Sequence, residues 1–88
     1  MNNEGFKVKV FDMEHGLTEY DNVTSVRIVS KDYNLLIMKD YLSILGEIIG
    51  SVNIKSDKDD VTYDNINGFY MNSNNVFNLM IKDRWYYD

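Results

Sequence analysis

Cysteine is absent from this chain, and histidine occurs once, as His15. Without cysteine there can be no disulfides, no thiolate ligands for zinc or iron–sulfur clusters, and no cysteine nucleophile. The lone histidine has no second imidazole to share a metal ion with. The fold must therefore be held together by packing alone.

Alanine and proline are missing as well. Alanine is the best helix former, so its absence disfavours long helices. Valine, isoleucine, tyrosine and phenylalanine, the residue types enriched in strands, are abundant. The composition therefore indicates a chain built mainly from β-strands.

Length and charge narrow the possible classes of protein further. The 88 residues are about enough for one small domain, which we expect to span residues 1–88. Nine basic and 14 acidic residues give a net charge of −5 and a pI of about 4.6. Such a field repels phosphate backbones, so nucleic acid is not an expected partner.

No segment has the pattern of a membrane anchor or an export signal. The longest apolar runs, residues 35–38 and 42–45, are far shorter than the roughly 20 residues that cross a bilayer as a helix. The first ten residues, MNNEGFKVKV, lack the basic-then-apolar order of a signal peptide. We expect a cytoplasmic protein, or one held at a membrane surface by a complex without inserting into the bilayer.

Alternating apolar and polar residues predict a series of short strands. Residues 6–10, FKVKV, have the period of two that is typical of a strand with one buried face. Residues 35–38 form a continuous apolar run, which suits a strand between two layers or beside a partner. Residues 41–50 fit either a short helix or a strand. Further extended segments are predicted at residues 17–20, 24–30, 51–55, 61–63, 65–71 and 76–81.

Polar segments separate the predicted strands. The charged run SDKDD, residues 56–60, is expected to be the solvated tip of a hairpin, and residues 31–34 and 72–75 are expected to be turns. Turn signals recur about every eight to twelve residues, and no long helical pattern occurs. These features predict an all-β fold, a small antiparallel β-sandwich or barrel of about 8–10 short strands.

Two charged clusters could in principle bind a metal ion. Asp12, Glu14 and His15 are close in sequence, but adjacent residues of an extended segment point to opposite faces, which favours a solvated turn. The acidic residues within 57–60 resemble part of a calcium loop without its glycine or its bidentate glutamate. No glycine-rich phosphate loop and no serine nucleophile motif is present. We expect no catalytic residue, no cofactor and no metal.

Two apolar features indicate contacts with another protein. Arginine, tryptophan and tyrosine are enriched in interface hot spots, and the C-terminal segment combines all three, which makes Trp85 a candidate partner contact. Trp85 is equally consistent with a cap on one end of the core. Residues 35–49 carry many large apolar side chains, which either complete the core or face another subunit.

The order and content of these segments resemble the N-terminal β-sandwich domain of the epsilon subunit of F-type ATP synthases, called delta in mitochondria. The opening strand of that family corresponds here to FKVKV, and its next two segments to GLTEYDN and VTSVRIV. Two later blocks of the family are similar to YNLLIMKDYLSILGEIIGSVNI and DNINGFYMNSNNVFNLMI. The likeness runs from about residue 6 to residue 83, and the apolar register and the NGF step are its most specific parts.

The sequence departs from the family pattern at several positions. Leu36 stands where the family has a glycine, residues 39–43 replace a proline-containing corner, and Asn67 replaces the first of two glycines. Gly68 is retained, and we expect it at a bulge or at a close approach of two backbones. The chain leaves no room for the family's C-terminal helical hairpin, so the resemblance implies a subunit that couples and does not regulate.

The resemblance implies a non-catalytic rotor subunit in the central stalk of a rotary ATPase. Such a subunit binds the gamma subunit, rests in complete synthases on the polar loops of the membrane ring, and helps to couple ATP hydrolysis or synthesis to rotation. The composition, typical of an AT-rich genome, resembles that of the divergent F-type-like ATPases of wall-less bacteria, some of which serve gliding. Matching the family's ring-facing and gamma-facing regions predicts four partner contacts: Asp32, Asn34, Asp40 and Tyr41.

Two other classes of protein remain open at this point. One is an independent β-sandwich adaptor, for example of phage or mobile-element origin, that uses Trp85 or residues 35–49 to bind a different partner. A stable monomer or homodimer without affinity for a gamma subunit would favour the adaptor. The other is a small enzyme or ligand-binding barrel, which would need a deep polar pocket because the sequence offers no catalytic constellation.

Overall fold

A computed structural model of the protein describes residues 5–84, and these residues form six β-strands and no helix. The all-β fold predicted from the sequence is confirmed. The described part of the chain accordingly has no helix long and apolar enough to cross a membrane. The strands are β1 (Phe6–Asp12), β2 (Gly16–Ser30), β3 (Asn34–Ile37), β4 (Ile44–Ser56), β5 (Asp60–Ser73) and β6 (Val76–Arg84).

Five of the six strands close into a small barrel. The order around the barrel is β1, β6, β5, β4 and β2, and β2 pairs with β1 to complete the circle. Every pairing is antiparallel except that of β1 with β6, which is parallel and joins the two ends of the described chain. β3 lies outside the circle and pairs only with residues 26–29 of β2.

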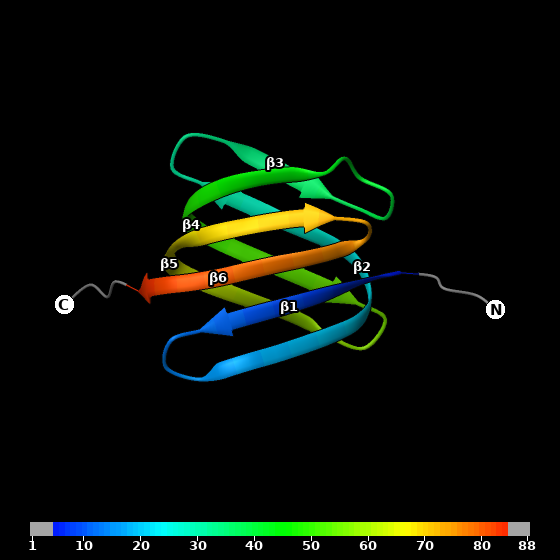
Figure 1. Ribbon diagram of the computed structural model, residues 1–88, viewed down its shortest axis with the longest axis horizontal. Helices are drawn as coiled ribbons and strands as arrows, with labels where there is room; N and C mark the ends of the chain where they lie inside the picture. Colours follow the sequence, from blue (N-terminus) through cyan, green and yellow to red (C-terminus); the bar gives the residue numbers. More distant parts are fainter. Residues whose placement is uncertain (1–4, 85–88) are drawn as a thin grey trace.

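The barrel is flattened into two layers, and the three long strands β2, β4 and β5 each run through both layers (Figure 1). We call the nearer layer in Figure 1 the β1–β6 layer. It contains β1, β6 and the adjoining parts of the long strands, residues 16–22, 44–49 and 66–73. The other layer, called the β3 layer, contains β3 and residues 23–30, 50–56 and 60–65.

The structure has fewer and longer strands than the 8–10 short ones predicted. Segments expected as separate strands are continuous, because the polar residues between them form β-bulges and do not turn the chain back. Asn22 and Asn65 have φ of 55° and 56°, and the strand register shifts beside each of them. Asparagine tolerates this left-handed conformation better than most residues. The ambiguous segment 41–50 is extended from Ile44 onward and continues through Gly50 as β4.

The core lies between the two layers and is formed by inward-facing residues of all six strands. Its largest fully buried side chain is Phe77, whose ring stacks on Tyr70 with the ring centroids 5.6 Å apart. The stacked arrangement suits the quadrupoles of the two rings. The buried apolar residues are Phe6, Val8, Val10, Val23, Val26, Ile28, Ile37, Ile48, Val52, Ile54, Ile66, Tyr70, Phe77, Leu79 and Ile81.

Tyrosine hydroxyl groups form two sets of hydrogen bonds between segments that are far apart in the sequence. In the first set the hydroxyls of Tyr20, in the β1–β6 layer, and Tyr63, in the β3 layer, are 2.7 Å apart and hydrogen-bonded. In the second set the Tyr33 hydroxyl donates to the carbonyl oxygen of Glu47 at 2.6 Å and lies 2.9 Å from the Tyr70 hydroxyl. Burial, followed by the hydrogen bond with Tyr33, raises the pKa of Tyr70, so this phenol stays protonated.

Gly68 lies where two backbones approach closely, as predicted. A Cβ atom at this position would collide with the carbonyl oxygen of Met80 on the neighbouring strand. We expect Gly68→Ala to lower the free energy of unfolding by about 1–3 kcal/mol, measured by urea denaturation. Gly16→Asn is a matched control, because Gly16 has open space around it and a φ of 79° that asparagine adopts. Equal losses in the two variants would contradict this explanation.

The Tyr20–Tyr63 hydrogen bond should contribute measurably to the contact between the layers. We expect a double-mutant cycle of Tyr20→Phe and Tyr63→Phe to give a coupling energy of about 0.5–1.5 kcal/mol in thermal or urea unfolding. The cycle of Tyr20→Phe with Tyr33→Phe is the control, because the hydroxyls of these two residues bond to different partners and the two effects should be additive. Zero coupling in the first cycle would show that the bond adds nothing.

Candidate interaction surface

The outward face of the β1–β6 layer carries a row of apolar side chains that crosses four neighbouring strands. Phe69 lies opposite Met80, Met80 opposite Phe11, and Phe11 opposite Leu17. Each of these side chains is 40–54% exposed. Their immediate neighbours along the strands, such as Leu79 beside Met80, point inward and are buried, so these strands are apolar on both faces. This pattern is typical of strands that are covered on both sides.

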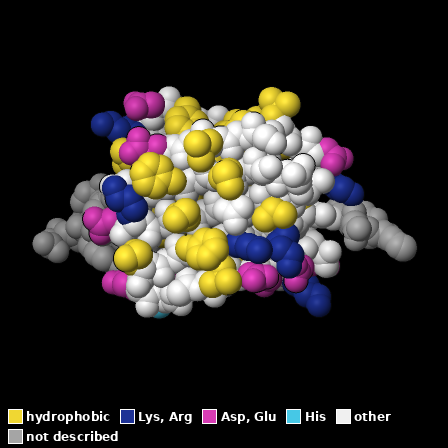
Figure 2. All heavy atoms as spheres, viewed as in Figure 1, with side chains coloured by type: hydrophobic (Ala, Val, Ile, Leu, Met, Phe, Trp, Pro, Cys, Tyr) yellow, Lys and Arg dark blue, Asp and Glu magenta, His cyan; other side chains and the backbone are white. Residues whose placement is uncertain are grey.

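The row ends on β4 at the exposed Glu47, opposite Phe69, and two more apolar side chains lie beside Phe69 in the next row. Leu45 on β4 lies opposite Met71 on β5, and these side chains are 76% and 48% exposed. We call the set of six residues the apolar band: Leu17, Phe11, Met80, Phe69, Met71 and Leu45. Figure 2 shows hydrophobic side chains gathered across the middle of this face. Exposed apolar patches often mark interaction sites, so the apolar band is the candidate interaction surface of this structure.

Three lysines lie near the apolar band, and they differ in whether they form ion pairs. Lys7 forms ion pairs with Asp21 at 3.2 Å and Glu19 at 3.4 Å, and the hydrogen bond to Asp21 is the main cause of the raised pKa of Lys7. Lys9 and Lys82 have no ion pair among residues 5–84. The ammonium group of Lys82 lies 5.6 Å from the centre of the Phe69 ring, a cation–π distance. The band is therefore flanked by two lysines without an ion pair among residues 5–84, and the exposed carboxylates of Glu19 and Glu47 lie opposite Lys9 and Phe69.

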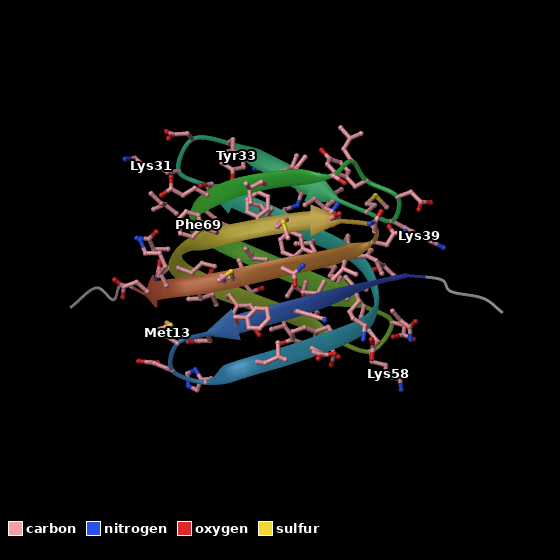
Figure 3. All side chains as sticks on the ribbon, in the orientation of Figure 1. Met13, Lys31, Tyr33, Lys39, Lys58 and Phe69 are labelled. Carbon is pink, nitrogen blue, oxygen red and sulfur yellow. The ribbon has the colours of Figure 1, made fainter. Side chains whose placement is uncertain are left out.

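The partner contacts predicted from the sequence lie in two loops at opposite ends of β3. Asp32 is exposed in the loop between β2 and β3, and Asn34 is exposed as the first residue of β3, where its amide oxygen accepts a hydrogen bond from Arg27 at 3.1 Å. Asp32 also lines a surface hollow of about 340 Å³. Figure 3 shows Lys31 and Lys39, which mark the two loops, at opposite ends of the molecule. The structure thus separates the predicted contacts into two groups.

The second group lies beside the hairpin between β5 and β6. The backbone N–H of Asp40 donates to the side-chain oxygen of Asn75 at 2.6 Å, and the Asn75 amide donates to the Asp40 carboxylate at 3.0 Å. Tyr41 is half-buried and packs against the core. Asp40 therefore has a structural role in fixing this corner, and its partner contact remains a prediction, as do those of Asp32, Asn34 and Tyr41. Trp85 lies outside the described residues.

The sequence of residues 35–49 left two alternatives open, burial in the core or contact with another subunit, and both apply in part. Ile37 and Ile48 are fully buried in the core, whereas Leu42 and Leu45 are more than 70% exposed. Most of the apolar band lies elsewhere, on β1, β2, β5 and β6, and was not predicted. The sequence signals the band by three runs of adjacent apolar residues, at positions 10–11, 69–71 and 79–81, where apolar and polar residues no longer alternate.

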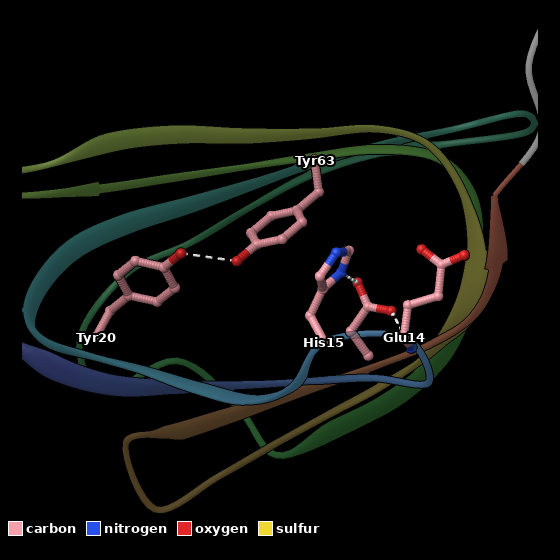
Figure 4. A network of polar contacts seen from close by, with 5 residues as sticks. Glu14, His15, Tyr20 and Tyr63 are labelled. Carbon is pink, nitrogen blue, oxygen red and sulfur yellow. Dashed lines mark hydrogen bonds and ion pairs between the residues drawn. The ribbon is translucent and has the colours of Figure 1, made fainter.

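Asp12, Glu14 and His15 form the group of potential metal ligands found among the described residues. Their ligand atoms lie within 4.8 Å of one another, because residues 13–15 form the exposed turn that the sequence favoured. The Asp12 carboxylate accepts the backbone N–H of Glu14 at 2.9 Å and lies 3.2 Å from Nδ1 of His15. Figure 4 shows this turn together with the Tyr20–Tyr63 hydrogen bond. The carboxylate thus shapes the turn, and we assign no metal to it.

Among solved structures, the chain is similar to one from the cryo-EM structure of the Tetrahymena thermophila mitochondrial ATP synthase, central stalk/c-ring. The TM-score is 0.74 with 11% sequence identity, and the match covers 97% of this chain and 69% of the other. No protein-family model and no curated protein sequence matches the chain. The structural likeness shows that the fold of this protein also occurs in the central stalk/c-ring assembly of a rotary ATP synthase.

The apolar band should contribute little to the stability of the isolated protein. We expect Met80→Ser to change the free energy of unfolding by less than about 0.5 kcal/mol, because Met80 is already half exposed. Leu79→Ser, one residue away but fully buried, should cost about 3 kcal/mol or more, because it leaves a cavity and a buried hydroxyl. Urea denaturation followed by circular dichroism measures both. A comparable loss in the two variants would show that the band is part of the core.

Proposed function

We propose that this protein is a non-catalytic rotor subunit, of the epsilon type, in the central stalk of a rotary ATPase. The observation that carries the proposal is a likeness of fold over 97% of the chain to a protein from an ATP synthase central stalk/c-ring structure. The resemblance of sequence blocks to the epsilon N-terminal domain points in the same direction. The proposed partner is the gamma subunit, with contact to the membrane ring in a complete complex, so the protein would be peripheral to the membrane.

The architecture suits a component that transmits force between larger subunits. A close-packed barrel deforms little under load, because its interior has the density of an organic crystal. The apolar band provides an uncovered surface on which a partner can gain binding energy from buried apolar area. The predicted contacts at the two ends of β3 would give the partner subunits additional polar contacts. No catalytic step is assigned to this chain, and its role is to couple hydrolysis or synthesis of ATP to rotation.

Affinity purification of the tagged protein from its own cells, followed by mass spectrometry, tests the proposal. We expect α, β and γ subunits of a rotary ATPase in the eluate at moderate salt. A tagged unrelated protein of similar size and charge is the control. An eluate without rotary ATPase subunits would contradict the proposal and would favour an independent adaptor that uses the same sandwich for another partner. Other proteins recovered with the subunits would identify what the motor drives, such as ion transport or gliding.

The predicted contacts Asp32 and Asn34 can be tested in the same experiment. We expect Asp32→Ala with Asn34→Ala to lower the recovery of partner subunits without changing the fold, because both side chains are exposed. Thr62→Ala is a suitable control, because it alters an exposed side chain on the outward face of the β3 layer. Unchanged recovery with the double variant would show that this loop is not a partner contact.

A further inference from the structure

The apolar band has the length and width of a strip that receives one helix. Neighbouring strands are about 4.8 Å apart, so a band that crosses five strands from Leu17 to Leu45 is roughly 19 Å long. A helix rises 1.5 Å per residue, so this length corresponds to roughly 13 residues, or three to four turns. One face of such a helix presents about four apolar side chains at spacings of three and four residues.

The polar residues beside the band keep it narrow. In the neighbouring row on one side, the residues on β2, β1 and β6 are polar, namely Glu19, Lys9 and Asn78. The same row becomes apolar on β5 and β4, where Met71 and Leu45 belong to the band. Lys82 lies on the other side of the central residues, over Phe69. Packing of a second sheet needs an apolar area that is wide in both directions, whereas a helix needs only a stripe. Two members of the band, Met71 and Met80, are methionines, which adapt to the shape of an incoming side chain.

The charged residues beside the band indicate which side chains a bound helix should carry next to its apolar stripe. Lys7 already has carboxylate partners within the chain, but Lys9 and Lys82 lack them among the described residues and lie on opposite sides of Met80. These two lysines place one positive charge on each long side of the band, although the exposed carboxylates of Glu19, opposite Lys9, and Glu47, opposite Phe69, lie on the same face. Carboxylates on a partner would be attracted to them, and cationic side chains would be repelled.

We propose that the apolar band is the docking site for an amphipathic α-helix of a partner protein, with an apolar stripe bordered by aspartate or glutamate. The inference rests on the proposed function in taking the partner to be a subunit of the same assembly. A second copy of this chain is a poorer occupant, because residues 5–84 contain no helix to dock and the two copies carry the same net negative charge. The helix buries Met80 and Phe69 at its centre and places carboxylates near Lys9 and Lys82.

Site-specific photo-crosslinking of the full chain in its own cells identifies the occupant. A photoreactive residue replaces Phe11 in the band or, as a control, Val29 on the outward face of the β3 layer; their exposures are 40% and 41%. We expect the Phe11 position to crosslink to a segment whose sequence has apolar residues at helical spacing and acidic residues beside them. A crosslink to a basic segment, to a strand, to lipid or to this chain itself overturns the proposal, as does stronger crosslinking from the Val29 position.

Charge reversal tests the role of the two lysines. We expect Lys9→Glu with Lys82→Glu to lower the recovery of the crosslinked partner about tenfold, equivalent to about 1.4 kcal/mol of binding energy. Lys55→Glu with Lys58→Glu is the matched control, because it makes the same change of charge at exposed positions away from the band. Circular dichroism confirms that each variant is folded. Equal loss in both double variants would mean that net charge, and not the flanks of the band, controls binding.

Apolar truncation separates this inference from the proposed function. We expect Phe11→Ser with Met80→Ser to abolish capture of the partner, whereas Val29→Ser with Leu36→Ser, similarly exposed on the other layer, retains it. If rotary ATPase subunits co-purify equally with both double variants, the docking site is wrong and the proposed function stands. If the wild-type protein captures no rotary ATPase subunit but its Phe11 position crosslinks to an acidic amphipathic helix, the docking site stands and the proposed function is wrong.

Discussion

The parallel pairing of β1 with β6 is the constraint on which the rest of the structure depends. It joins strands from the two ends of the described chain, and without it the sheet could not close into a barrel. It places the inward residues of β1, Val8 and Val10, against Phe77 and Leu79 in the core. The same register sets Phe11 beside Met80 on the outside. One set of backbone hydrogen bonds therefore builds the centre of the core and the centre of the apolar band.

Local patterns in the sequence predicted the all-β class, the first strand and the solvated tip at residues 56–60, because each depends on neighbouring residues. The tip is fixed by Ser56, whose hydroxyl accepts the backbone N–H groups of Lys58 and Asp59. The number of strands could not be predicted in the same way. A polar pair such as Asp21-Asn22 has the composition of a turn, and only pairing with β1 makes it a bulge. The closing parallel pair is a long-range contact with no local signal.

The candidate surface shows a similar division. The resemblance to a family predicted contacts at the two ends of β3, because the matched sequence positions lie there. The apolar band emerges only when five strands are set side by side, because each strand supplies one or two of its residues. A fold shared at 11% identity is maintained by the pattern of inward residues, which leaves outward residues free to differ between proteins. The outward face is accordingly where the partner specificity of this chain should be sought.

The bulges at Asn22 and Asn65 have a mechanical consequence. At each of them a strand leaves one layer and enters the other without a loop, so β2 and β5 belong to both layers as continuous backbone, and β4 crosses at Gly50 in the same way. In a sandwich of separate strands, sliding one layer over the other is resisted mainly by side-chain packing. Here such a shear would have to stretch three covalent chains. A load applied to the apolar band would therefore reach the far side of the molecule through bonds and not only through contacts.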